Sequence, residues 1–514
     1  MGGHLRRVIG NLRSDRVRLP AALAAGGLLW AFSLPPYGSG ILAVAAYAVV
    51  LVAIPGESPR RALAWGWAGG ALWEAATLWW LVPTMVRYGG LSTPVSVLLV
   101  LGMCAILGLY TAGFLGTMAH LCRRWGPGAL ALAPFAWVLW EWLRGTLLTG
   151  FPWWGPGYSL SVYQAFVPAA RWFGVLGLSF MVLLAASAAA LYARQRQSPV
   201  ALGVLVAALL VLGGTFGWGW WWSSRPPLPW PKDTVGYIQP QIGQDEKWDA
   251  RFAGEIRTRL GELTIALAPY HPKLVIWPES CTPLTWEEDT DFRNQVKDLA
   301  REVKCPILLG TVLTREGAYM NGAVLVQDAD APLATYAKTH LVPFGEYVPL
   351  KHLLFFAKPL VEAVGDFRPG TDLAPMSTPA GKAGVTICYE GIFPSLVRRQ
   401  VAMGAELLIN ITNDAWYEGT PGPVQHYLME RVRAVENDRY LIRSANGGVS
   451  GVVDPRGHLQ AATTPDVAAS FWGLVEPRRT RTLWSRVGDW WLMVPLGVVL
   501  LMGLFVPRRR SAEA

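Results

Sequence analysis

Long apolar runs separated by short loops fill roughly the first 220 residues of the chain, and one more run lies near its end. The eight runs occupy residues 19–34, 40–54, 63–85, 94–121, 128–143, 172–193, 200–218 and 491–506. A helix needs about 20 apolar residues to cross a bilayer. Several runs are shorter or are interrupted by Gly and Pro, so their order is better defined than their ends. The pattern predicts a polytopic α-helical membrane domain with about eight spans.

Basic residues gather in alternate loops of this region. Arginine clusters lie at the N-terminus and at residues 60–61, 123–124 and 194–196, and the loops between them carry less charge for their length. Because basic loops stay on the cytoplasmic side, we predict a cytoplasmic N-terminus and place the segment after the seventh run in the periplasm. The last run ends in the arginines 508–510, which would return the C-terminus to the cytoplasm.

A polar segment, residues 223–486, separates the seventh run from the eighth and begins with a proline-rich linker. The predicted strands are 235–238, 274–276, 307–309, 323–326, 385–387, 407–411 and 441–444. The predicted helices are 251–267, 292–303, 395–403 and 424–437. Such alternation is typical of an α/β domain. We therefore predict a membrane domain at 1–222, a periplasmic domain at 223–486 and a final span with a basic tail at 487–514.

The composition agrees with an integral membrane protein that has a large polar part. Hydrophobic residues make up 52% of the chain and charged residues 16%, and the mean hydropathy is +0.29. The net charge of +9 lies in loop clusters rather than in a stripe interleaved with aromatic residues, which argues against a nucleic-acid partner. The five cysteines contain no CxxC pair, which argues against a disulfide framework or a zinc site.

The segment VTICYEGIFP, residues 385–394, carries the first candidate for chemistry. A β-branched run ends at Cys388 and a glycine follows shortly, so the thiol is expected where a buried strand turns into the next element. A nucleophile in that place can face a pocket with backbone N–H groups behind it. Taken alone, a cysteine of this kind more often packs as a small hydrophobic residue.

Two further residues give the thiol possible partners. Glu279 follows the predicted strand 274–276, and Lys338 lies in the segment YAKTH. If these strands share a sheet, their ends can meet at one cleft. A carboxylate could then take the thiol proton, and an ammonium could stabilise a thiolate or an oxyanion. Each of these charges by itself is more often an exposed surface residue.

An outward loop of the membrane region is a separate candidate. Glu141 and Arg144 close the fifth run, and the segment GFPWWG follows at 150–155. Charged residues at a membrane boundary are candidates for function, but a belt of Trp with a snorkelling Arg explains the same pattern equally well. His340 and His426 lack the spacing of metal ligands, and a structural role is favoured for His426.

Four segments of the polar domain, taken together, resemble the carbon–nitrogen hydrolase (nitrilase) superfamily. They are WPES at 277–280, YAKTHLVPFGEYVP at 336–349, TICYEGIFP at 386–394 and the long segment 410–457. The membrane flanks, the GFPW loop and FGEYVP further resemble one membrane-bound family of that superfamily, the apolipoprotein N-acyltransferases. The resemblance covers nearly the whole chain and implies an α-β-β-α sandwich for the periplasmic domain.

The resemblance also implies roles for residues that match the family motifs. Glu279 is expected as the general base, Lys338 as the oxyanion stabiliser and Cys388 as the nucleophile. Glu346 is expected to hold or polarise Lys338. Three more residues match supporting positions of the family: Tyr389, Glu390 and Trp248.

The implied reaction transfers a fatty acyl chain from a phospholipid, for which phosphatidylethanolamine is expected, through a thioester on the cysteine. The acceptor would be the α-amine of the S-diacylglyceryl cysteine that begins an apolipoprotein, in the last step of lipoprotein maturation. No metal or organic cofactor is expected, and the protein is expected to be a monomer in the bacterial inner membrane.

Two other functions remain open on the residues alone. In a membrane-bound amidase or nitrilase, water would take the thioester, and the same three residues would serve. A transporter with an added domain would use Glu74 and Glu141 as intramembrane acids. The sequence shows no inverted repeat to support this second reading.

Overall fold

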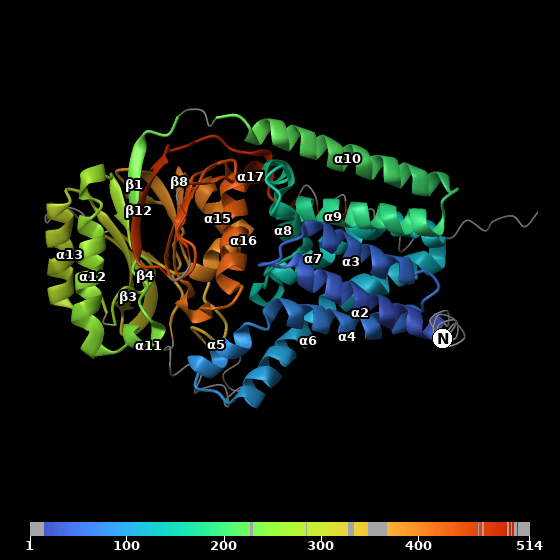
Figure 1. Ribbon diagram of the computed structural model, residues 1–514, viewed down its shortest axis with the longest axis horizontal. Helices are drawn as coiled ribbons and strands as arrows, with labels where there is room; N and C mark the ends of the chain where they lie inside the picture. The colour runs from blue at the N-terminus through green and yellow to red at the C-terminus, as the bar shows by residue number, and fades with distance from the viewer. Residues whose placement is uncertain are drawn as a thin grey trace, which may run out of the picture. The chain divides into compact units, whose positions relative to one another are not determined.

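Two units make up the protein in the computed structural model, one of helices alone and one built on β-sheets (Figure 1). The first unit comprises Met1–Trp79, Val97–Trp222 and Val487–Ala514, and the second Trp80–Ser96 and Ser223–Arg486. The structure describes residues 15–226, 230–283, 285–326, 334–347, 367–460, 462–464, 467–490, 493–494, 496–497 and 501.

The first unit is a bundle of apolar helices. Its longer elements are α2 (Asp15–Ser33), α3 (Gly40–Ala53), α4 (Pro59–Leu78), α6 (Thr93–Trp125), α7 (Ala133–Thr146), α9 (Ala170–Arg194) and α10 (Pro199–Ser223). The short helix α8 (Pro156–Ser161) precedes α9. Among the described residues, three helices are long and apolar enough to cross a membrane, Thr93–Trp125, Val167–Arg194 and Pro199–Ser223. Val17–Ser33 and Gly40–Ala53 are shorter apolar helices, so the eight spans remain a prediction.

Small residues let these helices approach closely. A side chain at Gly108 of α6 would meet the backbone of Trp67 and Ala71 of α4 at 2.7 Å, so only glycine fits there. The described part of the last predicted span also packs in this unit. Met493 and Leu496 form one cluster with residues of α7 and α9, whereas most of 491–506 lies outside the described residues.

The predicted span 63–85 is wrong beyond Leu78. Helix α4 ends at Leu78, and a separate helix, α5 (Leu81–Arg87), follows. Pro83 lacks an N–H, and its ring would clash with the carbonyl four residues earlier, so one continuous helix through this point is disfavoured. The helix is interrupted at Trp79 and Trp80, although the apolar pattern of the sequence continues through them.

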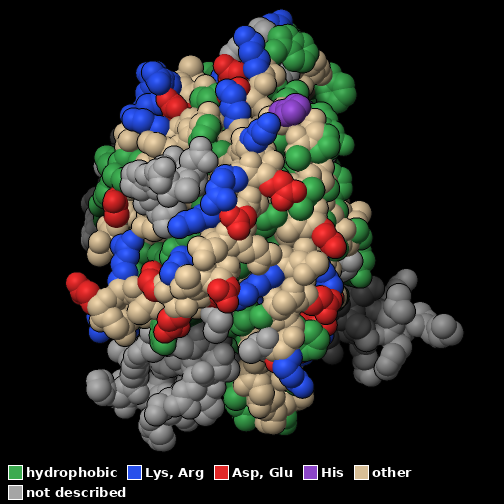
Figure 2. Space-filling model, turned by 90° about the vertical axis from the view of Figure 1, so that its left-hand side faces the viewer, with side chains coloured by type: hydrophobic (Ala, Val, Ile, Leu, Met, Phe, Trp, Pro, Cys, Tyr) green, Lys and Arg blue, Asp and Glu red, His purple; other side chains and the backbone are tan. Residues whose placement is uncertain are grey.

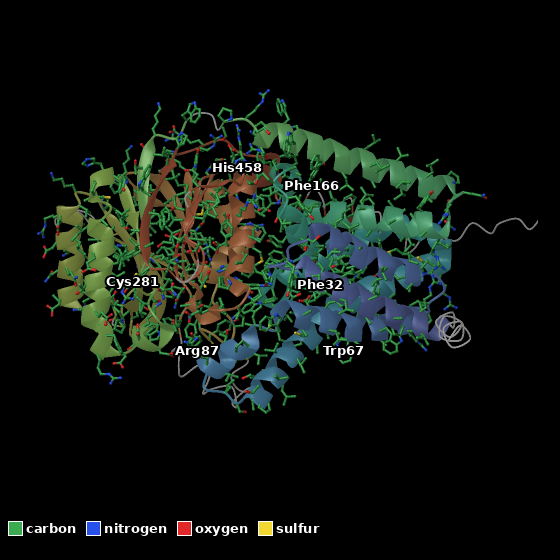
Figure 3. The ribbon with its side chains drawn as sticks, in the orientation of Figure 1. Phe32, Trp67, Arg87, Phe166, Cys281 and His458 are labelled. Carbon is green, nitrogen blue, oxygen red and sulfur yellow. The ribbon has the colours of Figure 1, made fainter. Side chains whose placement is uncertain are left out.

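The segment after this break packs with the second unit. In α5, Thr84 donates to the carbonyl of Trp416 at 3.0 Å. Arg87, at the end of α5, pairs with Glu418 at 3.3 Å and lies 3.7 Å from Asp245 (Figure 3). A stretch between two helices of the bundle is therefore anchored on the β-sheet unit by hydrogen bonds and charge.

Two six-stranded sheets form the centre of the second unit. The first has the order β12-β1-β2-β3-β4-β5 and the second β11-β10-β9-β8-β7-β6. The strands of the first sheet are β1 (Asp233–Gln239), β2 (Leu274–Ile276), β3 (Ile307–Arg315), β4 (Ala318–Val326), β5 (Ala334–Ala337) and β12 (Ala469–Val475). Those of the second are β6 (Met376–Thr378), β7 (Gly381–Ile387), β8 (Leu407–Asn413), β9 (Leu441–Asn446), β10 (Gly451–Val453) and β11 (Leu459–Gln460). Strands β1-β2-β3 and β7-β8-β9 are parallel, and the outer pairs are antiparallel.

Helices cover the outer faces of both sheets (Figure 1). Helices α12 (Ala253–Ile265) and α13 (Thr290–Glu302) lie on the first, and α15 (Pro394–Ala402) and α16 (Gly422–Asn437) on the second. The inner faces meet, since the hydroxyl of Ser444 in β9 donates to the carbonyl of Ile238 in β1 at 2.8 Å. The α-β-β-α sandwich is therefore confirmed. Figure 2 shows acidic and basic side chains interspersed over one outer face.

The cores of the two layers are apolar, as the strand patterns predict. One cluster packs the first sheet against α12 and α13 through residues such as Val275, Trp277 and Phe292. Another packs the second sheet against α15 and α16 through Val397, Leu408 and Ala434. All seven predicted strands and all four predicted helices are present, whereas β5, β6, β10, β11 and β12 were not predicted.

Candidate active site

Cys388 lies at a sharp change of backbone direction. Strand β7 ends at Ile387, and the 3₁₀ helix η7 (Cys388–Ile392) begins with the cysteine itself. Cys388 has a φ of 51°, in the left-handed region that a non-glycine residue rarely adopts. Such a conformation costs on the order of 1–3 kcal/mol and persists only where neighbours hold it. The predicted place of the thiol, at the end of a buried strand, is confirmed.

Glu390 supplies much of that support. Its side chain is 0% exposed and accepts the backbone N–H of Ile387 at 2.9 Å. It also accepts the hydroxyl of Tyr336 at 2.9 Å and the backbone N–H of Thr339 at 2.7 Å. Because Tyr336 and Thr339 flank Lys338, one carboxylate joins the turn that carries the cysteine to the strand end that carries the lysine.

Lys338 follows β5 and is 1% exposed. Its Nζ lies 2.9 Å from Oε1 of Glu346 and 3.8 Å from Oε1 of Glu279. Burial alone would lower the pKa of Lys338, but the two carboxylates outweigh burial and raise it above its ordinary value. The ammonium therefore stays charged over the whole neutral pH range.

Two hydrogen bonds orient the carboxylate of Glu279, which follows β2. The side-chain amide of Asn321 donates to Oε1 at 2.7 Å, and the backbone N–H of Asn413 donates to Oε2 at 2.9 Å. Asn321 also donates to Glu346 at 2.7 Å, so one amide aligns both acids around Lys338. At Gly310 in β3, a Cβ atom would lie 2.6 Å from the Cα of Glu279, so a bulkier residue would displace the acid.

The thiol of Cys388 is protonated in this environment. Burial raises its pKa first and the charge of Glu279 raises it further, whereas the charge of Lys338 lowers it. A thiol of this kind needs a base to become a nucleophile. A carboxylate and an ammonium that both act on it are the groups needed for proton removal and for stabilising negative charge.

Two of the supporting residues predicted from the sequence differ in exposure, since Tyr389 is buried and Trp248 is exposed. Tyr389 is buried, and its ring packs against Phe393 with centroids 4.9 Å apart. Trp248 is 43% exposed and directly follows the short helix α11 (Gln244–Lys247). Glu279, Lys338, Cys388, Glu346 and Glu390 are linked through the contacts above, whereas Trp248 lies at the exposed edge of α11.

Sequence reasoning missed Asn321 and Lys247. Asn321 lies in the middle of the antiparallel pair β3–β4, opposite Val312, where a single Asn gives no motif. Lys247 precedes Trp248 and is 1% exposed, although its neighbours Asp245 and Glu246 are exposed. A lysine in a polar stretch is ordinarily a surface charge, so nothing in the sequence marked either residue.

His426 belongs to a buried ionic cluster of its own rather than to the group of charges around Lys338. Its Nδ1 lies 3.0 Å from Asp414 and its Nε2 2.8 Å from Glu430. Arg443 donates to Asp414 and to Glu430, each at 2.7 Å. Burial would lower the pKa of His426, but Glu430 and Asp414 raise it to about 9. Among the described residues, no group of His, Cys, Asp and Glu side chains could hold a metal ion.

A second set of buried charges lies in the helical unit. Arg144 of α7 donates to Glu74 of α4 at 2.6 Å and to the carbonyl of Trp153 at 2.8 Å. Glu141 accepts from the indole of Trp137 at 2.7 Å and from the hydroxyl of Ser179 at 2.9 Å. Glu141 and Arg144 are thus bound to side chains of α4, α7 and α9 and to the backbone of the loop.

Comparisons with known proteins match both units. Residues 235–468 match the carbon-nitrogen hydrolase family model, and residues 26–188 match the model of the apolipoprotein N-acyltransferase N-terminal domain. The chain is 34% identical over 499 residues to the apolipoprotein N-acyltransferase of Geobacter metallireducens, covering 94% of each chain. It is 30% identical over 505 residues to that of Nitrosomonas europaea, covering 96% of this chain and 99% of the relative.

Solved structures resemble part of the chain. The carbon-nitrogen hydrolase of Helicobacter pylori G27 has a TM-score of 0.39 and 19% identity, covering 50% of this chain and 94% of the other.

Proposed function

The chain belongs to the apolipoprotein N-acyltransferase family, the acyltransferases of lipoprotein maturation, and we propose that Cys388 carries the acyl group as a thioester. One observation carries this proposal. The thiol stands at a strained strand end, under the charges of a hydrogen-bonded carboxylate, Glu279, and a permanently charged ammonium, Lys338. Covalent catalysis divides one difficult transfer into two easier steps.

In the first step Glu279 takes the thiol proton as sulfur attacks an ester carbonyl of the phospholipid. Lys338 and a backbone N–H near Tyr389 stabilise the negative charge on the oxygen of the tetrahedral intermediate. The carbon–oxygen bond breaks, Glu279 returns the proton to the leaving alkoxide, and a lysophospholipid departs. The thioester remains on Cys388.

In the second step the α-amine of the apolipoprotein attacks the thioester carbonyl. Glu279 takes a proton from the amine, the carbon–sulfur bond breaks, and the thiolate regains that proton. Glu346 keeps Lys338 charged and in place in both steps, because its carboxylate is the nearest anion to Nζ. Glu390 holds the strand ends together, and Trp248 contributes an exposed aromatic surface beside the site.

The donor and the membrane arrangement extend the proposal. We take phosphatidylethanolamine as the donor and a monomer as the active form. The three long apolar helices support an inner-membrane protein. We further propose about eight spans, both termini in the cytoplasm, and a catalytic domain at 223–486 in the periplasm between membrane parts at 1–222 and 487–514.

The experiment that tests the nucleophile compares two buried cysteines. Wild type, Cys388→Ala and Cys281→Ala are incubated with phosphatidylethanolamine in detergent, and the intact mass of each protein is measured. Cys281 is the control because it is 1% exposed and lies two residues after Glu279 (Figure 3). Wild type and Cys281→Ala should gain one acyl chain, and Cys388→Ala none. An adduct on Cys388→Ala, or none on wild type, would overturn the mechanism.

The same incubation separates transfer from hydrolysis. A diacylglyceryl lipopeptide with a free α-amine should remove the acyl chain from the enzyme, and the mass of the lipopeptide should rise by that of the acyl chain. If free fatty acid appears at the same rate with and without the lipopeptide, water is the acceptor and the amidase reading is correct.

A further inference from the structure

A second buried lysine lies beside the reacting groups and has no part in the mechanism above. Lys247 ends the short helix α11 and is 1% exposed, less than any neighbour in that helix. Its ammonium donates to the backbone carbonyl of Glu279 at 3.0 Å. A buried cation is costly unless oxygen atoms surround it, so this site must offer further acceptors.

Asn413 offers one of them. With its side-chain amide turned so that oxygen faces Lys247, that oxygen accepts from Nζ at 2.8 Å and from the indole of Trp416 at 3.3 Å. This orientation gives up a hydrogen bond to Gln244 at 2.8 Å and one from Asn446 at 2.9 Å, but it avoids pointing an amide N–H₂ group at an ammonium. Lys247 therefore binds the main chain of Glu279 and the side chain of Asn413 together.

These contacts join Lys247, Asn413 and Glu279, the proposed general base, to one another. The backbone N–H of Asn413 donates to the carboxylate of Glu279 at 2.9 Å. Lys247 binds both the donor of this hydrogen bond, Asn413, and its acceptor, Glu279. A change at Lys247 would loosen both ends of the bond that orients the base.

The charge of Lys247 differs from that of Lys338 in one respect. Lys338 faces Glu346 at 2.9 Å, whereas within the described residues no carboxylate lies at ion-pair distance from Nζ of Lys247. The titratable groups that face it from neighbouring elements are Glu279 and Cys281, after β2, and Cys388 of η7. Burial lowers the pKa of Lys247 and these groups raise it in part, which leaves it at about 8.

We propose that Lys247 is a positioning residue of the acyl transfer. It fixes the Glu279–Asn413 hydrogen bond, and its positive charge stabilises negative charge at Cys388. This inference rests on the proposed function. It explains why a lysine is buried here without a carboxylate partner. A lysine with a purely structural role would pair with a carboxylate. A cation bound to neutral oxygens is not neutralised, so it can stabilise negative charge that develops during the reaction.

The test uses Lys247→Met, Lys247→Arg and, as a control, Lys304→Met, which removes an exposed lysine. Acylation of Cys388 by phosphatidylethanolamine is followed by intact mass from pH 5 to 10, with folding checked by thermal unfolding. Lys247→Met should slow acylation roughly 10²-fold with little change in the KM for phospholipid.

The alkaline limb gives an independent readout. Wild type should lose rate as Lys247 loses its proton near pH 8, and Lys247→Arg should keep its rate above that pH because a guanidinium stays charged. Lys304→Met should behave as wild type.

Two results would overturn the proposal. One is acylation by Lys247→Met within about 2-fold of wild type with the alkaline limb unchanged, against the 10²-fold effect expected of a positioned charge. The other is an equal loss at every pH in both Lys247 variants, which would indicate a purely structural role. If Lys247→Met does not fold, Lys247→Arg alone still decides through the alkaline limb. Failure of the proposed function is distinct, because wild type would then form no adduct on Cys388.

Discussion

Two buried clusters, one in each unit, place a cation near two carboxylates, and of these two only the one around Lys338 acts on the proposed nucleophile, Cys388. In the β-sheet unit Lys338 lies between Glu346 and Glu279. In the helical unit Arg144 binds Glu74, and Glu141 lies three residues before it on α7. All of these residues are at most 9% exposed. Burial of charge alone therefore does not identify an active site.

The difference lies in what the groups face. Arg144 and Glu141 are bound to helix and loop groups, namely Glu74, the carbonyl of Trp153, the indole of Trp137 and the hydroxyl of Ser179. Glu279 is oriented by two hydrogen bonds but also acts on a thiol held at positive φ. We infer that a buried cluster can become reactive when its charges act on a strained nucleophile, and that it serves the fold when its groups bind only neighbouring side chains and the backbone.

The largest expected effect comes from an isosteric change in the reactive cluster. Glu279→Gln removes the proposed base but keeps a side-chain oxygen for Asn321, so folding should be retained. Acylation of Cys388 should fall on the order of 10⁴-fold, about 5.5 kcal/mol in the barrier. Rapid-quench intact-mass measurements check this. A loss below about 10-fold would mean that another group takes the thiol proton.

The next effect, in the helical cluster, concerns stability. Arg144→Met leaves the carboxylate of Glu74 buried without its cation and should destabilise the protein by about 4 kcal/mol. Acylation per folded molecule should not change. The double variant Glu74→Gln/Arg144→Met, which removes both charges, should recover part of the loss in thermal unfolding in detergent. Equal destabilisation in the single and double variants would show that the unpaired carboxylate of Glu74 is not the source of the loss.

A third effect separates the units by pH. The pKa of His426 is raised to about 9, from about 6.5 when unfolded, so its stabilising effect is full below pH ~6.5 and is lost as pH rises through 9. The β-sheet unit should lose up to about 3 kcal/mol between these limits. Denaturant unfolding of wild type and His426→Gln at several pH values measures this. A wild-type slope that persists in the variant would assign the loss to another group.

The sequence predicted the parts of the site that depend on local pattern. Strands β2 and β7 are apolar and β-branched, so the places of Glu279 and Cys388 at their ends followed from periodicity. Strand β5, which leads to Lys338, was missed because ATYA is too short to show alternation. Family resemblance, rather than pattern, assigned the lysine its role.

What could not be predicted depends on contacts between distant residues. Asn321 reaches Glu279 across 42 positions, and β12 pairs with β1 from at least 230 residues away. No local pattern carries such information. At Trp79 and Trp80 the local signal was present in Pro83, but the apolar run outweighed it, and the predicted span was too long.

The smallest expected effect completes the comparison, because it repeats the Glu→Gln change in the helical cluster. Glu141→Gln keeps an oxygen that can accept from the indole of Trp137, and its new amide can donate to the hydroxyl of Ser179. The cost should be about 1 kcal/mol of stability, that of one weakened hydrogen bond, and acylation per folded molecule should stay as in wild type. Thermal unfolding and the intact-mass assay, run beside Glu279→Gln, give both numbers. If Glu141→Gln instead slowed acylation 10²-fold or more with its stability intact, the loss would equal that of a catalytic acid. Glu141 would then belong to the reaction, and the distinction between the two clusters would be wrong.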